Sequence, residues 1–130
     1  VVLRVLIGVG LGEVGDRTVE GVARAEVGGD GHRVTGTGMR AGEALSLQYH
    51  ELKDESWLVQ EGRARLELGE VGGGLEAIEI ATGDAFRFRP GTVHRLTALE
   101  DTLVLEVSTP HVDDVVRLED RYGREGTSAP

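Results

Sequence analysis

The chain has 130 residues, 39% of them hydrophobic, with a formal net charge of −9 at pH 7. This length suits one domain with a real core, and the negative charge argues against a nucleic-acid or membrane partner, because phosphate groups select an excess of Lys and Arg. The absence of cysteine excludes disulfide and thiolate chemistry, and an anionic ligand would need a local basic pocket.

The first segment, residues 1–39, has little periodic pattern. The first 42 residues hold more than half of the 20 glycines and no aromatic residue. Strands at Val1–Val9 and Val19–Val27 are one interpretation and a disordered arm is the other, because glycine-rich strands specify their register weakly. The apolar opening run contains Arg4 and is shorter than the roughly 20 residues of a membrane span, so we expect neither an anchor nor a signal peptide.

From residue 44 onward, apolar and polar residues alternate in short runs separated by turns that contain glycine. The pattern predicts strands at Ala44–His50, Ser56–Gln60, Arg63–Leu68, Leu75–Ile80, Ala85–Arg89, Val93–Ala98 and Thr102–Val107. No amphipathic helix of ten or more residues is predicted here. Many short strands at regular spacing indicate an all-β sandwich or barrel.

Two segments combine glycines and polar residues at characteristic spacings. The first runs Gly42, Gln48, His50, Glu55 and Gly62, and the second runs Gly83, Pro90, Gly91 and His94. They resemble the two cupin motifs, G-x5-H-x-H-x3,4-E-x6-G and G-x5-P-x-G-x2-H-x3-N. Gln48, Arg89 and Ala98 replace the first His, the Pro and the final Asn of those motifs.

The resemblance implies a single-domain cupin double-stranded β-helix, which is a small jelly-roll barrel. Its core would span residues 40–110, with residues 1–39 as a separate N-terminal segment. Residues 111–130 would form a tail packed on or near the barrel, with its last residues frayed.

The resemblance also implies one divalent metal ion, held by Gln48, His50, Glu55 and His94. Gln48 and His50 share a strand face, and Glu55 follows after a turn, so these side chains can converge. Imidazole, carboxylate and amide oxygen suit zinc, manganese, iron, cobalt or nickel. Such a site retains positive charge and favours an oxyanionic ligand.

Three further segments, EALSLQYH, PGTVHRL and DDVVRLEDRYGR, resemble the phosphomannose isomerase branch of the cupins over about Arg40 to Arg124. That branch implies isomerisation of mannose 6-phosphate to fructose 6-phosphate through an enediolate. Lys53 and Arg95 are the candidate catalytic residues, and Arg121 and Arg124 the candidate contacts to the phosphorylated sugar.

The chain departs from that branch in several places. Leu52, Lys53 and Ser56 stand where the bifunctional enzymes of the branch usually carry His, Arg and His, and the usual KPWG segment is missing from residues 1–39. A metal- or sugar-binding cupin without catalysis, such as a sensor or accessory protein, is therefore the alternative. A metal-dependent oxygenase is a third hypothesis. We expect a homodimer, because exposed strand edges need cover. We expect a cytoplasmic location from the sugar-phosphate interpretation and from the lack of a recognisable targeting segment.

Overall fold

The structure is a computed structural model that describes residues 22–27, 32–111, 114–120, 123 and 125–127. All regular elements in this part are strands, and it contains no helix long and apolar enough to cross a membrane. The strands are β1 (Val22–Val27), β2 (Arg33–Met39), β3 (Leu47–His50), β4 (Glu55–Glu61), β5 (Arg63–Glu70), β6 (Leu75–Ala81), β7 (Ala85–Phe88), β8 (Thr92–Ala98), β9 (Thr102–Ser108), β10 (Val115–Glu119) and β11 (Gly126–Thr127).

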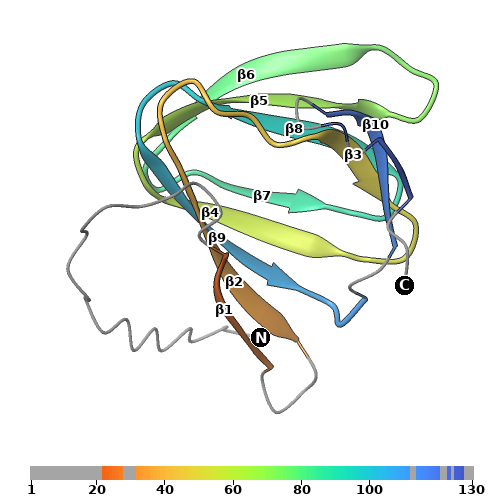
Figure 1. Cartoon of the computed structure of the whole chain (residues 1–130), viewed down its shortest axis with the longest axis horizontal. Helices are drawn as coiled ribbons and strands as arrows, with labels where there is room; N and C mark the ends of the chain where they lie inside the picture. Colours follow the sequence, from red (N-terminus) through yellow and green to blue (C-terminus); the bar gives the residue numbers. More distant parts are fainter. Residues whose placement is uncertain (1–21, 28–31, 112–113, 121–122, 124, 128–130) are drawn as a thin grey trace.

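The strands form two antiparallel sheets that face each other (Figure 1). One sheet has the order β1-β2-β9-β4-β7, and the other has the order β11-β10-β3-β8-β5-β6. Consecutive strands repeatedly change sheet, as β3 to β4 and β7 to β8 do. Residues at the ends of these strands can therefore meet between the sheets.

The core lies between the two sheets and follows the two-residue alternation of the strands. In β5, for example, Ala64 and Leu66 are fully buried while Arg63 and Arg65 are exposed. The large buried side chains include Trp57 from β4, Phe88 from β7 and Leu96 from β8. Trp57 packs edge-on against Phe88 with ring centroids 4.7 Å apart.

The seven strands predicted between residues 44 and 107 are present. The first of them is shorter than predicted, because Ala44 makes only an isolated bridge to Thr97 before β3 begins at Leu47. Of the two strands considered near the amino terminus, β1 lies within Val19–Val27, and Val1–Val9 is outside the described residues.

Three strands were not predicted, and the shortest of them is β11, whose two residues pair with β10. β2 lies in the segment that seemed patternless, yet it pairs with β9 at every residue from Arg33 to Met39. β10 lies in the predicted tail and pairs with β3, the strand that carries His50. β2 and β10 matter for the site, because each one borders it.

Candidate metal centre

Three buried side chains meet between the sheets. His50 is the last residue of β3 and His94 lies in β8, so both imidazoles come from the six-stranded sheet. Glu55 is the first residue of β4 in the other sheet. The backbone N–H of Gly91 donates to the carbonyl of His50 at 2.8 Å, which ties the loop before β8 to the end of β3.

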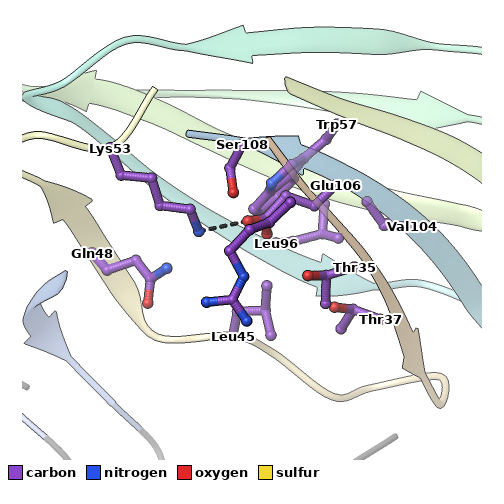
Figure 2. Close-up of a pocket in the computed structure, with 11 residues that line it drawn as sticks. Thr35, Thr37, Leu45, Gln48, Lys53, Trp57, Leu96, Val104, Glu106 and Ser108 are labelled. Atoms are coloured by element: carbon purple, nitrogen blue, oxygen red, sulfur yellow. Dashed lines mark ion pairs between the residues drawn. The ribbon is translucent and has the colours of Figure 1, made fainter. Parts of the chain in front are cut away.

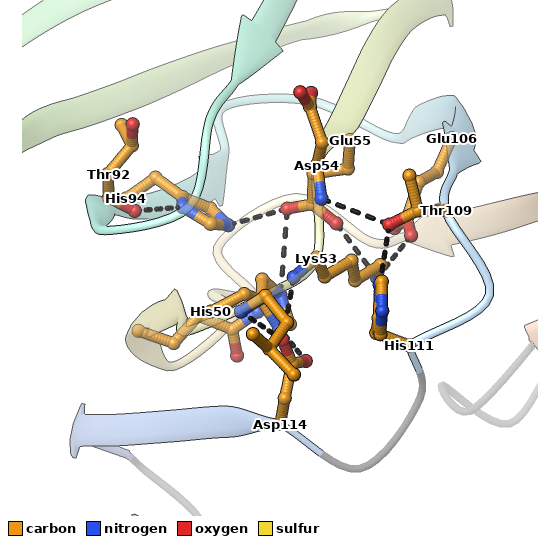
Figure 3. A network of polar contacts seen from close by, with 12 residues as sticks. His50, Lys53, Asp54, Glu55, Thr92, His94, Glu106, Thr109, His111 and Asp114 are labelled. Carbon is orange, nitrogen blue, oxygen red and sulfur yellow. Dashed lines mark hydrogen bonds and ion pairs between the residues drawn. The ribbon is translucent and has the colours of Figure 1, made fainter.

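The ligating atoms of this triad lie close together (Figure 3). Glu55 Oε1 is 2.9 Å from His94 Nε2 and 3.7 Å from His50 Nε2, and all three atoms lie within 4.8 Å of one another. All three are buried, and none makes a hydrogen bond of good geometry to the described residues. Buried polar atoms without partners are costly, so three of them at one point indicate a site for a shared partner.

The other ring nitrogen of each histidine is held from behind. His50 Nδ1 lies 3.0 Å from Asp114 Oδ1, and His94 Nδ1 lies 2.9 Å from the Thr92 carbonyl. Because both partners are acceptors, each Nδ1 carries the proton and each Nε2 presents a lone pair to the triad. This is the outer-shell arrangement typical of metal-binding histidines.

The charges of the triad also fit a cation. Burial raises the pKa of Glu55, but contact with His94 and the Lys53 charge outweigh it and lower that pKa to about 2. Burial lowers the pKa of His50, although Glu55 and Asp114 oppose that effect. The triad therefore combines an ionised carboxylate with two imidazoles, a donor set suited to zinc or another borderline divalent ion.

Lys53 links the triad to a second carboxylate. Its Nζ lies 2.8 Å from Glu55 Oε2 and 2.5 Å from Glu106 Oε1 on β9. Burial lowers the pKa of Lys53, but the two carboxylates outweigh it and raise that pKa, so Lys53 stays protonated. Burial and repulsion from Glu55 raise the pKa of Glu106 above its usual range.

A cavity of about 420 Å³ adjoins the triad (Figure 2). Lys53 and Glu106 lie on its wall, as do Gln48 and Trp57. The rest of the lining is Arg33, Thr35, Thr37, Leu45, Leu96, Val104 and Ser108. The Trp57 ring also lies edge-on to His94 with centroids 5.2 Å apart, so a ligand in the cavity would be next to the triad. The volume is in the range of small-molecule sites.

The four predicted metal ligands and Lys53 lie at the triad or beside it. His50, Glu55 and His94 form the triad, and Lys53 borders it. Gln48 lies directly opposite His94 in the pairing of β3 with β8 and lines the cavity, with its Oε1 accepting a hydrogen bond from Ser46 Oγ at 2.5 Å.

The structure does not bring Arg95 to the triad or to the cavity lining. Arg95 Nε donates to Glu67 at 2.6 Å, and its Nη1 donates to Glu119 at 3.0 Å. Strand alternation explains this placement, because Arg95 follows His94 directly and points to the other face of β8. Arg121 and Arg124, the predicted sugar-phosphate contacts, lie outside the described residues.

Residues 37–109, more than half of the chain, match the family described as Cupin domain. This chain is a cupin. The two-sheet barrel is the double-stranded β-helix of that family, and a search of curated proteins finds no match.

Solved structures show the same fold. An uncharacterized conserved protein with a double-stranded beta-helix domain from Klebsiella pneumoniae aligns over 80% of this chain and 90% of its own, at 19% identity and a TM-score of 0.64. KdgF from Halomonas sp. aligns over 69% of this chain and 78% of its own, at 26% identity and a TM-score of 0.58.

The capsular polysaccharide assembling protein CapF from Staphylococcus aureus aligns over 68% of this chain at 19% identity and a TM-score of 0.58. The aligned part is only 26% of that CapF chain. This cupin therefore spans about a quarter of the length of that larger protein.

Sequence reasoning missed three residues that border the centre. Glu106 could have been noticed as the one acidic residue in the apolar run LVLEV, and Asp114 as part of an acidic pair before another apolar run. Arg33 had no comparable signal, because its strand is interrupted by Gly36 and Gly38.

Proposed function

We propose that this cupin is a metal-dependent enzyme for a small, oxygen-rich anionic substrate, and that aldose–ketose isomerisation of a sugar phosphate is its reaction. The observation that carries this proposal is the Lys53–Glu106 ion pair, which lies where the metal triad meets the cavity. A metal-dependent aldose–ketose isomerase needs a metal site next to a proton-transfer group, and this border supplies residues for both.

The triad would hold the ion through His50 Nε2, His94 Nε2 and Glu55, with Gln48 as the proposed fourth ligand. A bound divalent ion supplies Lewis-acid stabilisation of the negative charge that develops on the sugar oxygens. Mannose 6-phosphate remains the lead substrate.

The residues around the cavity provide the proton transfer. Glu106 is our candidate for the base, because its raised pKa brings it closer to neutral pH while it remains hydrogen-bonded to Lys53. It would take the proton from the carbon next to the carbonyl and return it to the neighbouring carbon. Lys53, which stays protonated, would hold the Glu106 carboxylate in place and stabilise nearby oxygen charge.

The test is an isomerase assay with mannose 6-phosphate after loading with each candidate metal. Glu106→Gln should lower kcat by about 100- to 10,000-fold with unchanged metal content. Glu79→Gln is the matched control, because Glu79 is exposed and pairs with the exposed Arg63 on the six-stranded sheet, outside the cavity. Wild-type protein that binds metal stoichiometrically but gives no turnover would contradict the isomerase proposal.

A metal- and sugar-binding cupin without catalysis is the second candidate. The two ion pairs of Lys53 favour it, because they neutralise the charged groups next to the triad and leave no free amine as a base. In that case mannose 6-phosphate would bind the metal-loaded protein without being converted.

A further inference from the structure

One wall of the cavity belongs to β2, one of the strands that were not predicted. Arg33, Thr35 and Thr37 lie two residues apart on this strand, and all three line the cavity. Figure 2 shows Thr35 and Thr37 next to each other along this wall. Full pairing of β2 with β9 fixes these positions relative to Glu106, which lies directly opposite Thr35. The row is therefore a rigid part of the site.

Arg33 differs from the arginines of this barrel that form ion pairs. Arg63, Arg87 and Arg95 each contact a carboxylate, at 2.8, 2.7 and 2.6 Å respectively. Within the described part of the chain, Arg33 makes no ion pair, although the protein carries a net charge of −9 and half-buries this side chain. An unpaired guanidinium on a cavity wall is a ready partner for an anion.

Neighbouring donors are unused as well. The hydroxyls of Thr35 and Thr37 make no side-chain hydrogen bond to the described residues. Trp57, also on the wall, has a buried Nε1–H without a partner among the same residues. Hydroxyl and indole N–H groups can all donate to oxygen, so the wall presents several donors to one ligand.

The charge balance of the cavity also favours an anion. Lys53 and the two carboxylates that it contacts sum to one negative charge, which the Arg33 charge balances. A divalent ion on the triad would add positive charge to the same region. The basic pocket that an acidic protein needs for an anionic ligand is therefore found here.

We propose that the Arg33–Thr35–Thr37 row binds an oxyanionic group, a phosphate or a carboxylate, of the small molecule that occupies the cavity. Guanidinium can bind either group through two parallel N–H bonds, and the threonine hydroxyls can donate to the remaining oxygens. The row deepens the proposed function and rests on it, because it assigns the anionic end of the same substrate to β2.

Calorimetric titration of the metal-loaded protein tests the row with three probes that share one sugar ring: mannose 6-phosphate, mannuronate and mannose. Wild-type protein should bind at least one anionic probe about 10-fold or more tightly than mannose. Arg33→Gln should remove that preference, a loss of about 10- to 100-fold for the anionic probe, and leave mannose binding unchanged. The probe with the larger loss identifies phosphate or carboxylate as the group bound.

Arg63→Gln is the matched control, because it removes one positive charge from an exposed pair outside the cavity. Arg33→Lys keeps the positive charge but cannot form two parallel N–H bonds, so it should retain part of the preference for the anionic probe. This variant also tests the proposal if the Arg33→Gln protein fails to fold.

Three results would contradict the proposal that this row binds an oxyanion. They are wild-type protein that binds neither anionic probe more tightly than mannose, equal losses of anion affinity in Arg33→Gln and Arg63→Gln, and full anion affinity in the Arg33 variants. None of these readouts requires turnover. A failed isomerase assay with intact Arg33-dependent anion binding would therefore reject only the reaction.

Discussion

Asp114 contacts both the His50 ring and the backbone of the loop that leads to Glu55. Its Oδ1 accepts from His50 Nδ1, and its Oδ2 accepts from the backbone N–H groups of Leu52 and Lys53 at 2.8 and 2.7 Å. Burial raises the pKa of Asp114, but these hydrogen bonds outweigh it and lower that pKa, which keeps the carboxylate charged. One residue thus orients a ligand and fixes the turn beside it.

We predict that Asp114→Ala lowers metal affinity by about 10- to 100-fold, because the His50 ring loses the acceptor that fixes its tautomer. A competition titration with a chromogenic chelator would measure this loss. Asp114→Asn keeps an acceptor oxygen and should lose less. Glu119→Gln removes a negative charge from the adjoining strand and should change nothing; an equal loss there would show that only net charge matters.

Protons and metal compete for the His50 imidazole, which gives the centre a pH dependence. The pKa of Glu55 near 2 keeps this ligand ionised, and burial holds the pKa of His50 below 6.5. Metal content after dialysis should therefore stay constant above about pH 6.5 and fall as pH drops through about 6 and below. Elemental analysis at stepped pH checks this, and loss already at pH 8 would contradict it.

The triad was predictable from sequence because its spacing reflects local geometry: alternation on β3, one turn to β4 and a second motif around His94. Residues that act from other elements were not predictable in this way. Asp114 lies 64 residues from His50. Its role depends on the pairing of β10 with β3, which no local pattern in the chain specifies.

Among the elements, the strands between residues 44 and 107 were predictable because each alternates strongly and is bounded by turn residues. β2 was missed for the opposite reason. Its sequence RVTGTGM has two glycines and two threonines, so it lacks a clear apolar face. Its stability comes from long-range pairing with β9 rather than from its own composition.

The connection between β4 and β5 depends on a glycine with little room around it. Gly62 has φ +97°, and a Cβ there would lie 2.3 Å from the Asp101 carbonyl oxygen. Gly83 has nearly the same backbone conformation, φ +93°, but open space around it. Replacing Gly62 and Gly83 in turn by alanine therefore separates the free-energy cost of a left-handed backbone from the cost of a steric clash.

We expect Gly83→Ala to lower the free energy of unfolding by about 1–2 kcal/mol through backbone strain alone. Gly62→Ala should cost more than that, because the Asp101 backbone must also move. Urea denaturation of both variants measures the difference, and equal losses would show that the turn can relax around a methyl group.

At the scale of the whole molecule, a bound metal ion should link the two sheets and stabilise the fold, because its proposed ligands come from both sheets. At a free concentration 100 times the dissociation constant, binding stabilises the native state by about 2.7 kcal/mol, which corresponds to roughly 10 °C in Tm for a domain of this size. Thermal scans with and without a chelator would measure the shift. His50→Ala should show no chelator-dependent shift, and a shift of normal size there would place the metal elsewhere.

The outer edges of the two sheets suggest how copies associate. β6 ends the larger sheet and carries exposed Leu75 and Ile78. Exposed strand edges with apolar side chains are commonly covered by another chain, so a homodimer remains our proposal. Light scattering should give twice the mass of one chain over a wide concentration range, and the mass of a single chain throughout would contradict it.

The pairing of β10 with β3 also limits how far the chain can be truncated at its C-terminal end. The family match ends at residue 109, before Asp114 and the strand that follows it. A truncated chain that stopped at this boundary would keep all the predicted ligands, but the back of the His50 ring would be left to solvent. The functional unit is thus longer than the recognisable family segment, and minimal versions of it should extend at least through β10.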